Sequence, residues 1–208
     1  MTNVLRRMLF IAAAMTVLSA GTAGALMREP TEPIDTSGSG GGVTYQATPD
    51  FNGDKTADSC AVSDSDRTAS CTIKTQTITG TSTSPNVTYR TSLDPGWMAG
   101  RAWVDHNGDG KADYCRVVDY TRLACTVSIA PATTPASSLG SGFGEGFGDT
   151  FYSQNLDAGW DDTRTWKDVN GDGKMDYCRI TGNFIAGYQA QCTISNGQGF
   201  GGTVITLF

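Results

Sequence analysis

Histidine, glutamate and long apolar runs are all scarce in this 208-residue chain. His106 is the single histidine, and it lies in an acidic loop at a position that supplies no ligand, which argues against a Ser-His-Asp triad, a Cys-His pair or a zinc site. Eighteen of the 21 acidic residues are Asp and three are Glu, a balance typical of turn-rich β structure rather than of helices. Beyond residue 25, no apolar run reaches the roughly 20 residues that a membrane-spanning helix requires.

The N-terminal 25 residues have the pattern of a secretory signal peptide. Arg6 and Arg7 precede an apolar segment of 13 residues (8–20), and Ala23 and Ala25 supply a small-residue cleavage motif. We expect cleavage after Ala25, a secreted protein without membrane insertion, and a disordered Pro/Gly/Ser linker over residues 26–42. Cleavage leaves 13 basic and 21 acidic residues, a net charge of about −8, which argues against nucleic acid as a partner.

The rest of the chain is an internal repeat. Residues 93–117 match 156–180 at a constant offset of 63, and residues 50–60 match the second copy at an offset of 55. Each repeat reads as four short strands with β-branched and alternating residues. The sequence therefore predicts an all-β domain over residues 43–208, built from four-stranded repeats at about 43–92, 93–155 and 156–208.

Six cysteines in a secreted chain predict disulfides. In each repeat, one Cys follows an acidic loop and a second lies on the next strand, so a hairpin sets the two opposite each other. Six cysteines allow 15 complete pairings, and the repeat selects the one in which all three bridges lie within repeats. They are Cys60–Cys71, Cys115–Cys125 and Cys178–Cys192.

Each repeat also carries a nine-residue acidic loop of the form Asp-x-Asn-Gly-Asp-x-x-x-Asp. Calcium takes six to eight oxygen ligands, and such a loop offers them from positions 1, 3, 5, 7 (a backbone carbonyl) and 9. Without a cation, three converging carboxylates would repel one another. The alternative is a solvated turn without a metal. The predicted ligands are Asp50, Asn52, Asp54, Thr56 and Asp58; Asp105, Asn107, Asp109, Lys111 and Asp113; and Asp168, Asn170, Asp172, Lys174 and Asp176.

Position 6 makes the three predicted calcium sites unequal. Gly110 and Gly173 hold this position in the second and third loops, and Lys55 holds it in the first. Position 6 of such loops commonly takes a positive φ, which costs a residue other than glycine about 1–2 kcal/mol. We therefore expect up to three bound calcium ions, with the first site about 5–30-fold weaker.

The loop, the Trp-Val-Asp strand before it and the Gly-Phe-Gly segment after it resemble the FG-GAP (VCBS-like) repeat. This resemblance covers about residues 43–208 and implies β-propeller blades with calcium held between two blade strands. Arg116 and Arg179 stand at position 12, where an EF-hand carries Glu, so the helical calcium loop does not fit. Closed propellers have four to eight blades. Three repeats leave an open arc, a compact pseudo-threefold domain or a ring closed by a homo-oligomer as alternatives.

All four tryptophans lie in the lead-ins of the second and third repeats. Trp97 and Trp160, beside glycines, are the candidates for ligand binding, while Trp103 and Trp166 have the positions of packing residues. The sequence favours a non-enzymatic binding module for a glycan or a cell-surface protein. The alternatives are a structural or accessory domain in which calcium only stabilises the fold, and a hydrolase using aspartates such as Asp161 with Asp162 or Asp149 with Asp157.

Overall fold

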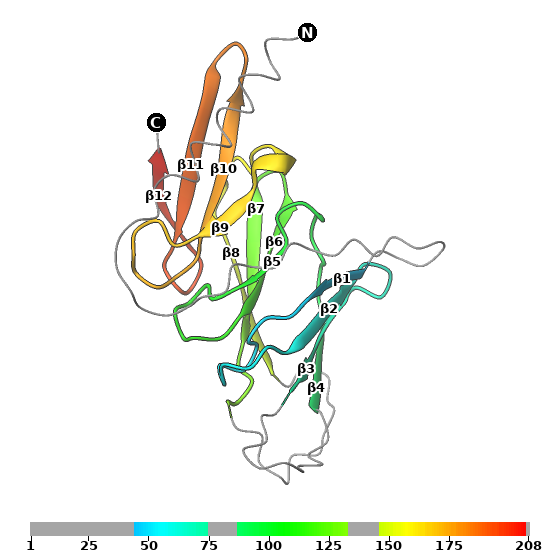
Figure 1. Cartoon of the computed structure of the whole chain (residues 1–208). Helices are drawn as coiled ribbons and strands as arrows, with labels where there is room; N and C mark the ends of the chain where they lie inside the picture. Colours follow the sequence, from blue (N-terminus) through cyan, green and yellow to red (C-terminus); the bar gives the residue numbers. More distant parts are fainter. Residues whose placement is uncertain (1–43, 75–86, 133–145, 207–208) are drawn as a thin grey trace.

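The computed structural model of the chain describes residues 44–74, 87–132 and 146–206 (Figure 1). The expected signal peptide and linker lie outside these residues. Within them, the fold is all-β, and the only helical element is one 3-10 turn, η1 (Asp161–Thr163). No helix in these three ranges is long and apolar enough to cross a membrane.

The twelve strands form three four-stranded antiparallel sheets, each a meander whose strands pair in chain order. This confirms the predicted all-β class with four strands in each repeat. Sheet 1 contains β1 (Thr44–Ala47), β2 (Ser59–Ser63), β3 (Thr68–Ile73) and β4 (Val87–Ser92). Sheet 2 contains β5 (Ala102–Val104), β6 (Asp113–Asp119), β7 (Arg122–Ser128) and β8 (Phe147–Tyr152). Sheet 3 contains β9 (Thr165–Lys167), β10 (Asp176–Asn183), β11 (Gly187–Ser195) and β12 (Phe200–Thr206).

Equivalent residues keep equivalent registers in the three sheets. Each pair of cysteines faces directly across the second and third strands of its sheet. The three predicted disulfides are confirmed, with Cα–Cα separations of 4.0–4.1 Å: Cys60–Cys71, Cys115–Cys125 and Cys178–Cys192. They indicate an oxidising environment during folding. Each closes a loop of about 11–15 residues, which in the chain-entropy model stabilises the fold by roughly 3 kcal/mol.

The hydrophobic core lies between successive sheets. Trp103 of β5 packs at 5.9 Å, ring centre to ring centre, from Phe51, which leads into β2. Trp166 of β9 packs at the same distance from Phe200 of β12 and at 5.0 Å from Tyr177 of β10. Both tryptophans are more than nine-tenths buried, which confirms that they are packing residues.

Sheet 2 lies between sheets 1 and 3, and the β10–β11 hairpin extends away from the rest of the molecule (Figure 1). One buried cluster joins residues of sheets 1 and 2, and a second joins residues of sheets 2 and 3. The acidic loops therefore occur at the same place in three consecutive sheets, between the first and second strand of each.

Candidate metal centre

The acidic loops, residues 50–58 (loop 1), 105–113 (loop 2) and 168–176 (loop 3), share one hydrogen-bond pattern. The carboxylate at position 1 accepts three backbone N–H bonds, from positions 4, 5 and 6. In loop 2, Asp105 Oδ1 accepts from Gly108 at 2.7 Å and Asp109 at 3.1 Å, and Oδ2 accepts from Gly110 at 2.8 Å. Asp50 and Asp168 accept the equivalent bonds in the other two loops. This carboxylate thus fixes the turn around itself.

Positions 3 and 5 continue the turn. Asn107 Oδ1 accepts the Asp109 N–H at 2.9 Å, and Asp109 Oδ1 accepts the Lys111 N–H at the same distance. The same two bonds recur in loops 1 and 3. Carboxylate and amide oxygens from three positions are therefore held on one short turn, which is a donor set suited to a hard cation.

The carboxylate at position 9 ties each loop to the third strand of its sheet. Asp113 Oδ2 accepts the His106 N–H at 3.0 Å, and Asp113 Oδ1 accepts the Ser128 N–H of β7 at 2.7 Å. Asp58 and Asp176 make the equivalent pairs of bonds. All three carboxylates are fully buried. Sequence reasoning assigned position 9 as a ligand and missed this structural role.

Burial gives these acidic groups unusual titration behaviour. Desolvation, with a smaller contribution from the neighbouring aspartates of each loop, outweighs the backbone hydrogen bonds and raises the pKa of Asp113 to about 7 and that of Asp58 to about 6. Desolvation raises the pKa of Asp105 as well. Within the part of the chain that the structure describes, the only loop aspartate with a basic partner is Asp172, whose carboxylate lies 3.3 Å from the Lys174 ammonium. The other eight loop aspartates concentrate negative charge without an ion-pair partner in the described residues.

Successive loops stack on each other through backbone contacts. The Ala112 N–H of loop 2 donates to the Asp50 carbonyl at 2.8 Å, and the Met175 N–H of loop 3 donates to the Asp105 carbonyl at 2.9 Å. The Ser128 hydroxyl also donates to the carbonyl of Phe51 in loop 1, and the Ser195 hydroxyl donates to that of His106 in loop 2. Loops 1 and 2 are therefore held both by their own sheets and by the sheet that follows.

Position 6 takes a left-handed backbone conformation in all three loops. The φ angle is 67° at Lys55, 83° at Gly110 and 82° at Gly173. This confirms the expected positive φ at that position, and it places a residue with a side chain in a conformation that favours glycine. Lys55 and Arg67 are the two residues other than glycine with positive φ among the described residues.

His106 belongs to the core rather than to a metal site. It occupies the place that Phe51 has in loop 1: Phe51 lies 4.8 Å from Phe147, and His106 lies 4.8 Å from Phe200. Its Nδ1 is 2.9 Å from the Ser195 hydroxyl, and burial lowers its pKa to about 4. The sulfurs nearest to it belong to the Cys115–Cys125 disulfide, so they are not thiolate ligands.

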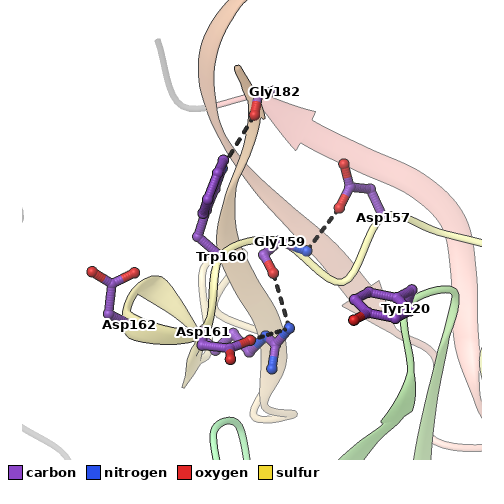
Figure 2. Close-up of a pocket in the computed structure, with 8 residues that line it drawn as sticks. Tyr120, Asp157, Gly159, Trp160, Asp161, Asp162 and Gly182 are labelled. Carbon is purple, nitrogen blue, oxygen red and sulfur yellow. Dashed lines mark hydrogen bonds and ion pairs between the residues drawn. The ribbon is translucent and has the colours of Figure 1, made fainter. Parts of the chain in front are cut away.

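The two candidate ligand-binding tryptophans have different surroundings. The Trp97 ring lies 4.5 Å from the Tyr120 ring and is partly buried. Trp160 is 51% exposed, and its indole N–H donates to the Gly182 carbonyl at 3.1 Å. Trp160 borders a cavity of about 470 Å³ that is also lined by three aspartates and one arginine (Figure 2). The other charged and aromatic lining residues are Tyr120, Asp157, Asp161, Asp162 and Arg164.

Comparison with known proteins gives one informative match. The chain is 33% identical over 96 residues to the NAD(+)–arginine ADP-ribosyltransferase Chelt of Vibrio cholerae, a region covering 43% of this chain and 13% of that protein. The chain thus spans a small fraction of the length of this curated relative. No family model and no solved structure matches the chain.

This match corrects the functional class expected from the sequence. A non-enzymatic binding module, the first expectation, conflicts with a relative whose name is that of an enzyme. The expectation that the protein is not an enzyme is overturned by the same finding. Triads, zinc sites and paired aspartates are signatures of hydrolases, so the lack of such a pattern does not bear on a transferase.

Proposed function

We propose that the chain binds calcium in its three acidic loops, and that it takes part in ADP-ribosyl transfer. The calcium proposal depends on one observation above all. Nine aspartates are placed in three equivalent loops, and eight of them lack a basic partner within the described residues. A divalent cation in each loop would offset that charge with the oxygen ligands that calcium prefers.

The ligands of each ion would be the side chains at positions 1, 3, 5 and 9 and the carbonyl at position 7. The backbone N–H bonds to positions 1, 3 and 5 bring these oxygens together on one short turn. The ions of loops 1 and 2 would then stabilise the contacts between successive sheets, because these two loops also bond to the following repeat.

We also propose that the three sheets are FG-GAP (VCBS-like) blades arranged as an open arc. Two observations support this arrangement. The sheets are consecutive meanders with equivalent loops, and sheets 1 and 3 lie at opposite ends of the molecule (Figure 1). Secretion, proposed from the leader sequence, agrees with the three disulfides.

The enzymatic part of the proposal is ADP-ribosyl transfer from NAD+ to arginine, as in the name of the relative. This reaction breaks the bond between nicotinamide and ribose and joins the ribose carbon to a guanidinium nitrogen, which loses a proton. Carboxylates can stabilise the positive charge that develops on the ribose. All three Glu lie outside the described residues, so in the described part the acids of the Trp160 cavity are the candidates for this role.

One assay per activity tests the proposal. Calorimetric titration of the purified chain measures calcium binding, and chelation followed by heating measures its effect on stability. Incubation with NAD+ and agmatine, followed by mass spectrometry, measures formation of ADP-ribosyl-agmatine. Product that requires the chain supports the transferase proposal. Its absence both with and without calcium would refute that part and leave the calcium proposal standing on its own titration.

A further inference from the structure

The repeat geometry points to a site for an arginine side chain beside Trp160 of the third repeat, and we propose that a partner protein supplies that arginine. The proposal starts from the boundary between sheets 2 and 3. There the Arg164 guanidinium lies 5.2 Å from the centre of the Trp97 ring. Its Nη1 also donates to the Ala99 carbonyl at 3.2 Å. An arginine from the following repeat therefore occupies a site that the lead-in of the preceding repeat forms.

The boundary between sheets 1 and 2 repeats this use of arginine. Arg101, the equivalent of Arg164, lies 2.7 Å from the Asp64 carboxylate in the β2–β3 hairpin. Both arginines are about 2% exposed. The fold thus joins each sheet to the next through a buried guanidinium, and an aromatic face or a carboxylate of the preceding repeat receives it.

Sheet 3 carries the same lead-in, and no described residue fills the equivalent position. Trp160 is the counterpart of Trp97 and remains half exposed, with its ring 6.4 Å from that of Tyr188. Asp161 and Asp162 replace Met98 and Ala99 of the second repeat. Residue 162 is thus equivalent to Ala99, whose backbone carbonyl receives a guanidinium, and it adds a side-chain carboxylate at that position.

The chemistry of this face favours a cation with a flat, apolar surface. Asp157, Asp161 and Asp162 line the cavity beside Trp160, and Arg164 is the single basic residue there (Figure 2). The Arg164 guanidinium is already engaged by Asp161 at 2.7 Å and by the Gly159 carbonyl at 2.9 Å. Asp162 is exposed and makes no hydrogen bond or ion pair in the described structure. A guanidinium stacks on aromatic rings and pairs with carboxylates better than an ammonium does.

A second copy of this chain is a poor source of the arginine. In each sheet, one residue directly precedes the first-strand residue that pairs with the loop cysteine. This residue is Arg101 in sheet 2, Arg164 in sheet 3 and Gln46 in sheet 1. Lys74 of sheet 1 likewise stands at the position of Ser128 and Ser195, whose hydroxyls bond to the loop of the preceding repeat. Sheet 1 therefore lacks the groups that join sheet 3 to sheet 2. The site stands on this repeat geometry and does not depend on the transferase proposal.

Titration of the full chain with the peptide Gly-Gly-Arg-Gly-Gly, followed by NMR in calcium buffer, tests the site. We expect the arginine peptide to bind at least fivefold tighter than its lysine counterpart, and Trp160→Ala to weaken it roughly tenfold. Trp160→Phe should keep most of the binding, because it keeps a ring, and it shows whether loss of the Gly182 hydrogen bond matters. Asp162→Asn should weaken binding several-fold, whereas Asp149→Asn, the same change outside the cavity, should not.

Equal binding of the arginine and lysine peptides, or unchanged binding in Trp160→Ala, would overturn the site. Light scattering identifies the source of the arginine. A concentration-dependent dimer that Trp160→Ala dissociates would overturn the assignment to a partner protein and place an arginine of a second copy in the site. A monomer that binds the arginine peptide supports the proposal as stated.

Discussion

Replacement of Lys55 by glycine tests whether position 6 controls calcium affinity. Lys55 has a φ of 67°, in the left-handed region, while its equivalents in loops 2 and 3 are glycines at 82–83°. The left-handed conformation costs a residue with a side chain about 1–2 kcal/mol. Glycine relieves this cost, but it also makes the unfolded chain more flexible, which offsets about 0.4–1 kcal/mol of the relief. The net expectation is about 0.5–1 kcal/mol in favour of the formed loop.

Calorimetric titration with calcium measures this difference. If the loop becomes fully ordered as the ion binds, Lys55→Gly tightens the weakest of the three steps by about two- to fivefold. Lys55 also carries a positive charge near the site, so its removal alone could raise affinity. Lys55→Ala separates the two effects, since it removes the charge and keeps the unfavourable φ. We expect the glycine variant to exceed the alanine variant by the two- to fivefold factor.

Gly110→Ala is the reciprocal change in loop 2. A Cβ at Gly110 has no heavy atom within 4 Å, so this substitution introduces the φ penalty without a clash. We expect a loss of similar size in one of the two tighter steps. The reasoning is refuted if Lys55→Gly and Lys55→Ala bind calcium equally, or if Gly110→Ala leaves all three steps unchanged.

Three further predictions concern stability. Asp113→Asn should destabilise the fold by about 1–3 kcal/mol in chemical denaturation, because it alters a buried acceptor of two backbone N–H groups, and it should remove one calcium ion. The pKa is raised to about 6 at Asp58 and to about 7 at Asp113 in the folded chain, whereas both carboxyl groups have the ordinary pKa of 3.8 in the unfolded chain. Between these values the folded chain keeps protons that the unfolded chain has released. The lowered pKa of His106 acts in the opposite direction, but the two carboxyl groups outweigh one imidazole. With chelator, stability should therefore fall as pH rises from about 4 to about 7, and calcium should reverse that trend, as melting curves across this range would show. Replacing Cys178 and Cys192 together by serine should cost roughly 3 kcal/mol in the same denaturation assay, and an unchanged midpoint would contradict the chain-entropy estimate.

The repeat made much of the fold predictable from the sequence. A constant offset between copies assigned four strands to each repeat, and it paired Cys178 with Cys192 without ambiguity. Local chemistry also predicted the left-handed backbone at Lys55, because the other two copies place glycine there. Such features depend on residues that are close in the chain or equivalent between copies.

Features that depend on contacts between repeats were not predictable in this way. The contact of Arg164 with Trp97 joins residues of different repeats, and nothing in either local sequence specifies it. The core position of His106 depends on its contact with Phe200 of the next sheet, which is equivalent to the contact of Phe51 with Phe147, and the local sequence does not specify it. The similarity to part of an ADP-ribosyltransferase was also not foreseen, because no motif considered in the sequence points to that class of enzyme.

The number of calcium ions bound by the intact chain tests the central claim most directly. Native mass spectrometry in calcium should detect up to three specific ions, two tight and one weak, and magnesium at the same concentration should not replace them. Replacing Asp50, Asp105 and Asp168 by asparagine should remove all three, because each removes the carboxylate at position 1. A wild-type chain that binds no more calcium than this triple variant would contradict the account.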